Sequence, residues 1–119
     1  MKVRCVRIVN PVTGKSAERS DSIRIGEEYV VIEIVASPGR YIDLRLYPFE
    51  GAPGLWSSEM FETTDDSIPT NWTAVVSDAG FLTIRPERWR VGFWERYFDD
   101  EPEATAIFDE ELAIMLAQS

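Results

Sequence analysis

The sequence predicts a mostly β fold with an added β-hairpin and C-terminal α-helices. Three observations support this. Apolar and polar residues alternate over 40–47, which is typical of a strand. Two further β-rich runs, 71–76 and 81–84, flank the short turn 78–80. The apolar residues of 102–116 recur instead at helical spacing.

The size and cysteine usage of the chain predict a single small domain in a reducing compartment. The 119 residues suit one domain over 1–119. A hydrophobic fraction of 45% is enough for one core without covalent staples. Cys5 is the only cysteine, so no intrachain disulfide can form. Because Cys5 lies in an alternating apolar run, we interpret it as a buried thiol rather than a nucleophile.

The residues of common catalytic sites are missing from the sequence. The chain has no histidine, which removes the commonest general base and the commonest metal ligand. No cysteine cluster or glycine-rich phosphate loop replaces it. The acidic pairs at 65–66 and 99–100 have no partner nucleophile. We therefore expect no enzymatic activity, no metal and no cofactor.

The net charge of −9 is concentrated in the second half of the chain. Residues 1–50 carry 8 basic and 7 acidic side chains, whereas 51–119 carry 4 and 14. This balance argues against nucleic-acid binding, because phosphate contacts need Lys and Arg. It favours a basic protein partner, or simply solubility. No apolar run approaches the ~20 residues that span a bilayer, and no signal peptide is evident, so we expect a cytoplasmic protein without membrane contact.

The first half of the chain reads as strands. A strand over 2–9 precedes the polar segment 10–22, which is either a long loop or a distorted hairpin around 13–15. The strongest strand is 29–35, and its continuous apolarity indicates contact on both faces or a bend where the facing switches. With 40–47 it should form an antiparallel hairpin. Alternation in that second strand predicts two faces, one with Ile42, Leu44 and Leu46 and the other with Tyr41, Asp43 and Arg45.

The second half should contain one hairpin and then helices. In the hairpin 71–84, Trp72, Ala74 and Val76 should share one face. Residues 86–89 can form one helical turn, and 92–98 a short aromatic helix.

A longer helix should follow, capped by Asp99 or Asp100 and ending near Leu116. Its core-facing stripe would be Ala104, Ile107, Phe108, Glu111, Leu112 and Met115.

Residues 1–63 resemble an SH3-type barrel. The run from Ile23 through Gly26 to Tyr29 is similar to the family's entry into its second strand. The segment 54–62 resembles the closing motif Gly-Leu-apolar-Pro-Ser-Asn-Tyr-Val-Glu, with matches at Gly54, Leu55, Ser58 and Glu62. The resemblance implies an SH3-like small β-barrel with a 3₁₀ turn between its last two strands. Residues 64–119 would add the hairpin and helices.

The departures from the SH3 pattern concern its ligand groove. Ser57 and Met60 stand where the family has Pro and Tyr, and 39–41 reads Gly-Arg-Tyr in place of the family's Trp pair. Those aromatic residues bind polyproline ligands in the family. We therefore expect proline-peptide binding to be lost. An SH3-like interaction module of a cytoplasmic assembly stays open as an alternative function.

The second half is similar to small bacterial immunity proteins, which bind a secreted toxin domain and block its active site. The similarity lies in Ile68-Pro69-x-Asn71-Trp72, in Pro86-x-x-Trp89 and in Gly92-Phe93-Trp94-Glu95-x-Tyr97-Phe98-Asp99-Asp100. It implies a protein that neutralises a basic toxin partner. The sequence leaves the oligomeric state open.

The partner-binding residues that we predict combine aromatic anchors with an acidic cluster. They are Trp89, Trp94, Glu95, Asp99, Asp100, Glu101, Glu103, Asp109 and Glu110. Two plainer interpretations stay open. The acids could be a solvated helix face with capping residues, and the rings could simply fill the core.

Overall fold

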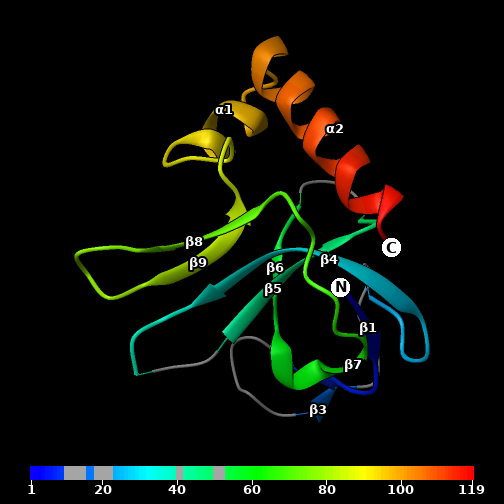
Figure 1. Cartoon of the computed structure of the whole chain (residues 1–119). Helices are drawn as coiled ribbons and strands as arrows, with labels where there is room; N and C mark the ends of the chain where they lie inside the picture. The colour runs from blue at the N-terminus through cyan, green and yellow to red at the C-terminus, as the bar shows by residue number, and fades with distance from the viewer. Residues whose placement is uncertain (10–15, 18–22, 40–41, 50–52) are drawn as a thin grey trace.

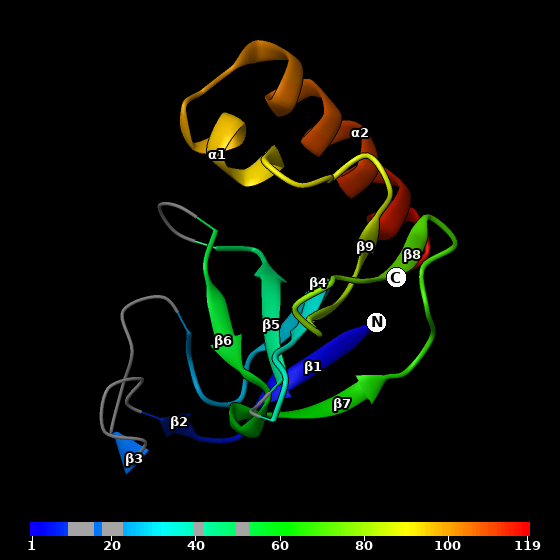
Figure 2. The same ribbon diagram turned by 90° about the vertical axis from the view of Figure 1, so that its left-hand side faces the viewer.

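The computed structural model of the chain describes residues 1–9, 16–17, 23–39, 42–49 and 53–119. The fold is mostly β with two C-terminal α-helices, as the sequence predicts, but the strands form an open antiparallel sheet where the SH3 resemblance implies a small barrel. Both helices lie together beyond one side of the sheet (Figures 1 and 2). Among the helices within these ranges, none is long and apolar enough to cross a lipid bilayer.

The strands follow the predicted order along the chain. Their bounds are β1 Lys2–Cys5, β2 Ile8–Val9, β3 Ser16–Ala17, β4 Glu28–Ala36, β5 Ile42–Tyr47, β6 Leu55–Ser57, β7 Phe61–Asp65, β8 Trp72–Val76 and β9 Leu82–Pro86. The strands β2 and β3 pair separately as a short antiparallel ladder. The expected turn at 13–15 lies outside the described residues.

Strand β4 is the centre of the main sheet. The strand order is β6-β5-β4-β1-β7, and β9 also pairs with β4. The edge of β4 opposite β5 is divided between two partners, because β1 pairs with its first residues and β9 with its last, from Ile34 to Ala36. The hairpin of β8 and β9 is therefore continuous with the sheet of the first half of the chain.

A register shift in β4 explains its continuous apolarity. Val31 pairs with Leu46 and Glu33 with Arg45, which leaves Ile32 without an opposite residue. Such a bulge bends a strand and changes which face its side chains occupy. Val31, Ile32 and Glu33 are consequently all buried. Of the two predicted explanations, contact on both faces or a bend where the facing switches, the register shift supports the bend.

The segment that resembles the SH3 closing motif forms a 3₁₀ turn, η1, over Ser58–Met60, between β6 and β7. The hydroxyl of Ser57 caps the turn by accepting a hydrogen bond from the Glu59 N–H. Met60 is buried, and its carbonyl accepts a hydrogen bond of 2.8 Å from the Val6 N–H. The predicted turn is confirmed, and it holds the residues that follow β1.

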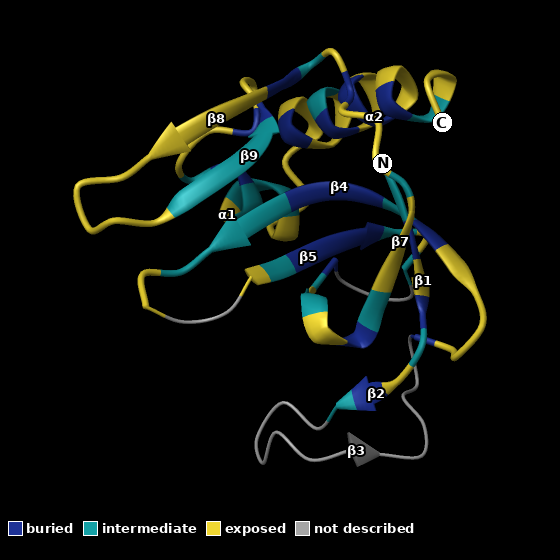
Figure 3. Cartoon of the chain, turned by 60° about the horizontal axis from the view of Figure 1, so that its bottom comes forward, coloured by how far each residue is buried: buried dark blue, intermediate teal, exposed yellow. Residues whose placement is uncertain are grey.

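Two of the predicted strand faces need correction. On β5, Leu44 and Leu46 are buried, but Ile42 is 46% exposed near the strand end, and Arg45 is buried on the opposite face. On β8, only Trp72 is buried, whereas Ala74 and Val76 are exposed. The reason is that β8 lies outermost and nothing in the described chain covers its far end (Figure 3).

The two helices are α1, Phe93–Phe98, and α2, Pro102–Ala117. The predicted cap of α2 is wrong by one or two residues, because its N-cap is Glu101 and no side chain caps it. Asp99 instead ends α1, and Asp100 has φ 56°, a left-handed conformation that Asp tolerates better than most residues. Pro102 takes the first helical position, where its missing N–H has no cost.

Aromatic stacking joins the helices to the sheet. Trp89 stacks on Phe93 and on Phe108, with centroid distances of 5.6 and 5.4 Å. Phe108 also contacts Phe49, which packs against Tyr47 of β5. The predicted stripe of α2 is confirmed, since all its members are buried except Ile107, which is half-buried. These rings are the second part of the core, beyond the sheet.

Replacing Phe108 with Ala should lower the free energy of unfolding by about 3–5 kcal/mol, because it leaves a cavity among stacked rings. Phe98→Ala is the matched control. Its ring is 48% exposed, and we expect a loss below about 1 kcal/mol. Urea denaturation monitored by Trp fluorescence measures both. Equal losses would contradict the packing described.

Candidate partner-binding surface

The candidate surface is built on the junction between α1 and α2. Gly92 is the N-cap of α1 and has φ 84°. Glycine suits this position because a residue with a side chain rarely adopts that conformation. The Asp99 N–H donates to the Glu95 carbonyl (3.0 Å) and the Glu101 N–H to the Arg96 carbonyl (3.1 Å). The acidic linker 99–101 is therefore held by the backbone of α1.

All seven predicted acidic side chains are exposed. They are Glu95 on α1, Asp99, Asp100 and Glu101 in the linker, and Glu103, Asp109 and Glu110 on α2. Within the described residues, Glu110 is the only member of this set that forms an ion pair. The neighbouring Glu111, part of the core-facing stripe, is buried.

Helix geometry divides the acids of α2 into two groups. Successive residues turn by about 100°, so Asp109 lies roughly 120° to one side of the buried stripe. Glu103 and Glu110, seven residues apart, lie on the other side. The structure therefore does not gather the predicted acids into one patch. The linker 99–101 stands at the N-terminal end, between the two groups.

The electrostatics around Tyr97 show which acids lie close to α1. Burial raises the pKa of Tyr97, and the negative charges of Asp109 and Asp100 raise it further. The phenol consequently stays neutral across the physiological pH range. Asp100 and Asp109 thus form, with Tyr97 and the exposed Phe98, one side of the junction between the helices.

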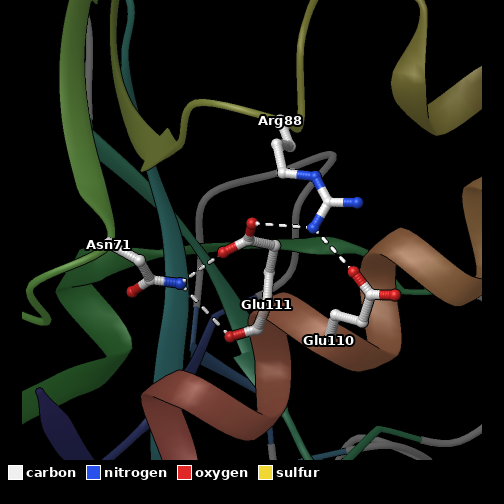
Figure 4. Close-up of polar contacts among 4 residues, drawn as sticks. All are labelled: Asn71, Arg88, Glu110 and Glu111. Carbon is white, nitrogen blue, oxygen red and sulfur yellow. Dashed lines mark hydrogen bonds and ion pairs between the residues drawn. The ribbon is translucent and has the colours of Figure 1, made fainter.

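The opposite side carries a polar network that the sequence did not indicate (Figure 4). Arg88 contacts Glu110 at 2.7 Å and Glu111 at 3.5 Å. The hydrogen bond to Glu110 is the main reason why the pKa of Arg88 is raised. Asn71 donates to the Glu111 carboxylate (2.9 Å) and to its backbone carbonyl (3.2 Å). This network ties α2 to the residues that flank β8 and β9, and it partly neutralises Glu110.

The two predicted tryptophan anchors differ in how far they are exposed to a partner. Trp89 has 0% exposure and forms part of the stacked core, so it supports the surface from below. Trp94 is half-buried. The apolar residues that the structure exposes here are Val91, at 96%, and Phe98, at 48%. Sequence reasoning missed Val91, because one apolar residue beside a glycine has no periodic signal.

A buried cluster of charges lies under α1. Glu33, which is 2% exposed, contacts Arg45 at 3.0 Å and Arg85 at 3.8 Å. The Trp94 indole N–H donates to the same carboxylate (3.2 Å), and the Arg45 guanidinium lies 4.1 Å from the Trp94 ring centroid. Arg45 also donates to the Pro53 carbonyl (3.1 Å). Three strands and α1 are thus joined at a single carboxylate.

A signal for this cluster was present in the sequence. Glu33 interrupts the most apolar strand, and Arg45 lies between two core leucines. Opposite charges isolated on two strands of one hairpin predict a cross-strand pair. The contribution of Arg85 and Trp94 could not be inferred, because neither is close in sequence.

Comparison of the chain with protein-family models, curated proteins and solved structures finds no match. The described part of the chain also contains no group of three or more acidic or cysteine side chains arranged to hold a metal ion.

Changing Glu33 to Gln should lower the free energy of unfolding by about 3 kcal/mol, because two arginines would lose a buried partner charge. Glu28→Gln is the matched control, since its pair with Lys2 is longer, at 3.9 Å, and exposed. The free energy of unfolding should fall much less in this control variant. Thermal and chemical denaturation measure both losses of stability. Equal losses would show that the buried pair contributes no more to stability than the exposed one.

Proposed function

We propose that this protein is a non-enzymatic binding protein that neutralises a toxin by covering its active site. The observation that carries the proposal is that exposed carboxylates lie around the junction of α1 and α2, in the linker 99–101 and on both sides of the buried stripe of α2. Six of the seven predicted carboxylates, all except Glu110, form no ion pair with any described residue. A partner with a basic cleft would supply the missing counter-charges.

The mechanism that we infer is electrostatic steering followed by steric occlusion. Complementary charge speeds the encounter of two proteins and fixes their orientation. Apolar contact then slows dissociation, and it would come from exposed Phe98, which directly precedes Asp99, and from exposed Val91, which precedes α1. The stacked rings beneath hold the surface in a fixed shape, which limits the entropy lost on binding.

A second candidate function is an SH3-like interaction module, and its support is the topology. Residues 1–63 include β1, β4, β5, β6 and the first part of β7. In this region β7 pairs with β1, β1 with β4, β4 with β5 and β5 with β6, and η1 lies between β6 and β7. We propose that these strands form an SH3-like barrel. A ligand of such a module would bind at residues 29–62 and depend little on salt.

Neutralising three acids of the surface should slow association with the toxin. The probe is the purified product of the gene next to its own, and the variant is Asp100→Asn with Glu103→Gln and Asp109→Asn. We expect the association rate at low salt to fall about tenfold, with a weaker salt dependence. Surface plasmon resonance measures both quantities.

The matched control carries Glu59→Gln, Glu62→Gln and Asp66→Asn, three exposed acids at η1, β7 and the connector after it. It has the same net charge as the variant but leaves α1 and α2 unchanged, so its association rate should stay close to the native rate. If both variants slowed association equally, the effect would be explained by net charge alone, without a specific role for α1 and α2. Chemical-shift changes confined to 29–62 would favour the interaction module instead.

A further inference from the structure

The open edges of the sheet differ in strand length and in the charged residues that they carry. Among the described residues, strand β7 pairs only with β1, and its edge region carries Glu62, Asp65 and Asp66. Strand β6 pairs with β5 alone in the described part of the chain and is three residues long before η1 begins. Charge and shortness are two devices that stop an exposed edge from pairing with another chain. Both of these edges are therefore protected.

Strand β8 has neither form of protection. Within the described residues it pairs only with β9, and Figure 3 shows it as the outermost strand, exposed along most of its length. Its sequence, Trp-Thr-Ala-Val-Val, contains no charge and no proline. Val75 is 46% and Val76 70% exposed. β-branched residues exposed on both faces suit a strand that gains a neighbour.

The hairpin turn indicates which backbone groups point outward. The Ser77 N–H donates to the Phe81 carbonyl at 2.9 Å, so these two residues form a hydrogen-bonded pair. Such pairs alternate along an antiparallel ladder. The N–H and C=O groups of 73 and 75 consequently face β9, whereas those of Ala74 and Val76 face the open edge.

Apolar rows of side chains run across the sheet to this edge. Ala36 pairs with Leu82, and Leu82 with Val76. In the next row on the same face, Ile34 pairs with Ile84 and Ile84 with Ala74. An added strand with small apolar side chains would extend both rows without introducing a charge.

The distribution of charge favours a second copy of the chain over a basic partner at this edge. Two copies that each carry −9 repel one another over most of their surface. Residues 71–84 contain one charged side chain, Asp78, which lies in the turn. This hairpin is therefore a part of the molecule where two copies can approach with little repulsion. A basic partner, by contrast, would gain little from an uncharged edge.

We propose that two copies of the chain associate through β8, related by a two-fold axis at Ala74. Ala74 would pair with Ala74 of the second copy through two N–H···O bonds. Val76 would then lie opposite Trp72 of the other copy, and Thr73 opposite Val75. The sheets become one continuous sheet, and the surface at the junction of α1 and α2 stays open on each copy. This association does not depend on the proposed function.

Sedimentation equilibrium of the full chain over a wide concentration range tests the proposal, at low and at high salt. We expect a reversible monomer–dimer equilibrium that tightens with salt, because salt screens the repulsion between copies. Hydrogen exchange at the amides of Ala74 and Val76 should slow as the dimer forms. A chain that remains monomeric at both salt concentrations would overturn the proposal.

Variants at the edge locate the contact. Ala74→Pro removes an outward N–H that β9 does not use, and we expect the dimer dissociation constant to rise by about tenfold or more, since two symmetric bonds are lost. Ala74→Lys and Val76→Lys should also weaken the dimer. Val91→Lys, the control, makes the same charge change at a residue that is 96% exposed, and it should leave the dimer intact.

Two further outcomes would overturn the proposal. A dimer that persists in all three edge variants, with their fold verified by circular dichroism, would place the contact elsewhere. A monomeric chain whose amides at 72–76 become protected only when the toxin is added would show that the edge binds the partner.

Discussion

The arrangement of the helices over the sheet depends on one buried carboxylate. Glu33 of β4 forms ion pairs with Arg45 of β5 and Arg85 of β9. It also accepts a hydrogen bond from the indole N–H of Trp94 in α1. A carboxylate with 2% exposure would be strongly unfavourable without such partners. An ion pair of this kind is weak evidence for added stability, but it restricts the arrangements that are compatible with burial. We infer that it fixes where α1 lies.

The candidate surface follows from that constraint. Trp94 is held from below by Glu33 and packs against Trp89 and Phe108. The same rings therefore position α1 against α2, and the acidic linker between the helices is short and bonded to the backbone of α1. A surface fixed in this way can present carboxylates in a constant arrangement. This is the property that an inhibitor of a basic cleft needs.

Local patterns in the sequence predicted most of the strands and the stripe of α2, because each depends on alternation, spacing or turn residues. The 3₁₀ turn was expected from the resemblance of 54–62 to the SH3 closing motif. Sequence patterns gave wrong predictions for residues whose burial or position depends on the tertiary structure. Ile42 and Val76 are exposed because no part of the chain that the structure describes covers the far end of the sheet, which alternation cannot indicate. Trp89 is buried because three segments meet around it, and Asp109 lies apart from Glu103 because the buried stripe separates them.

A double-mutant cycle of Glu33→Gln and Trp94→Phe tests most directly whether this carboxylate holds α1 to the sheet. The free energies of unfolding of the native chain, both single variants and the double variant are measured under one condition. We predict a coupling energy of about 1 kcal/mol or more, because each variant breaks the same contact between the sheet and α1. Additivity within about 0.3 kcal/mol would contradict the account, since α1 would then be positioned by ring packing alone.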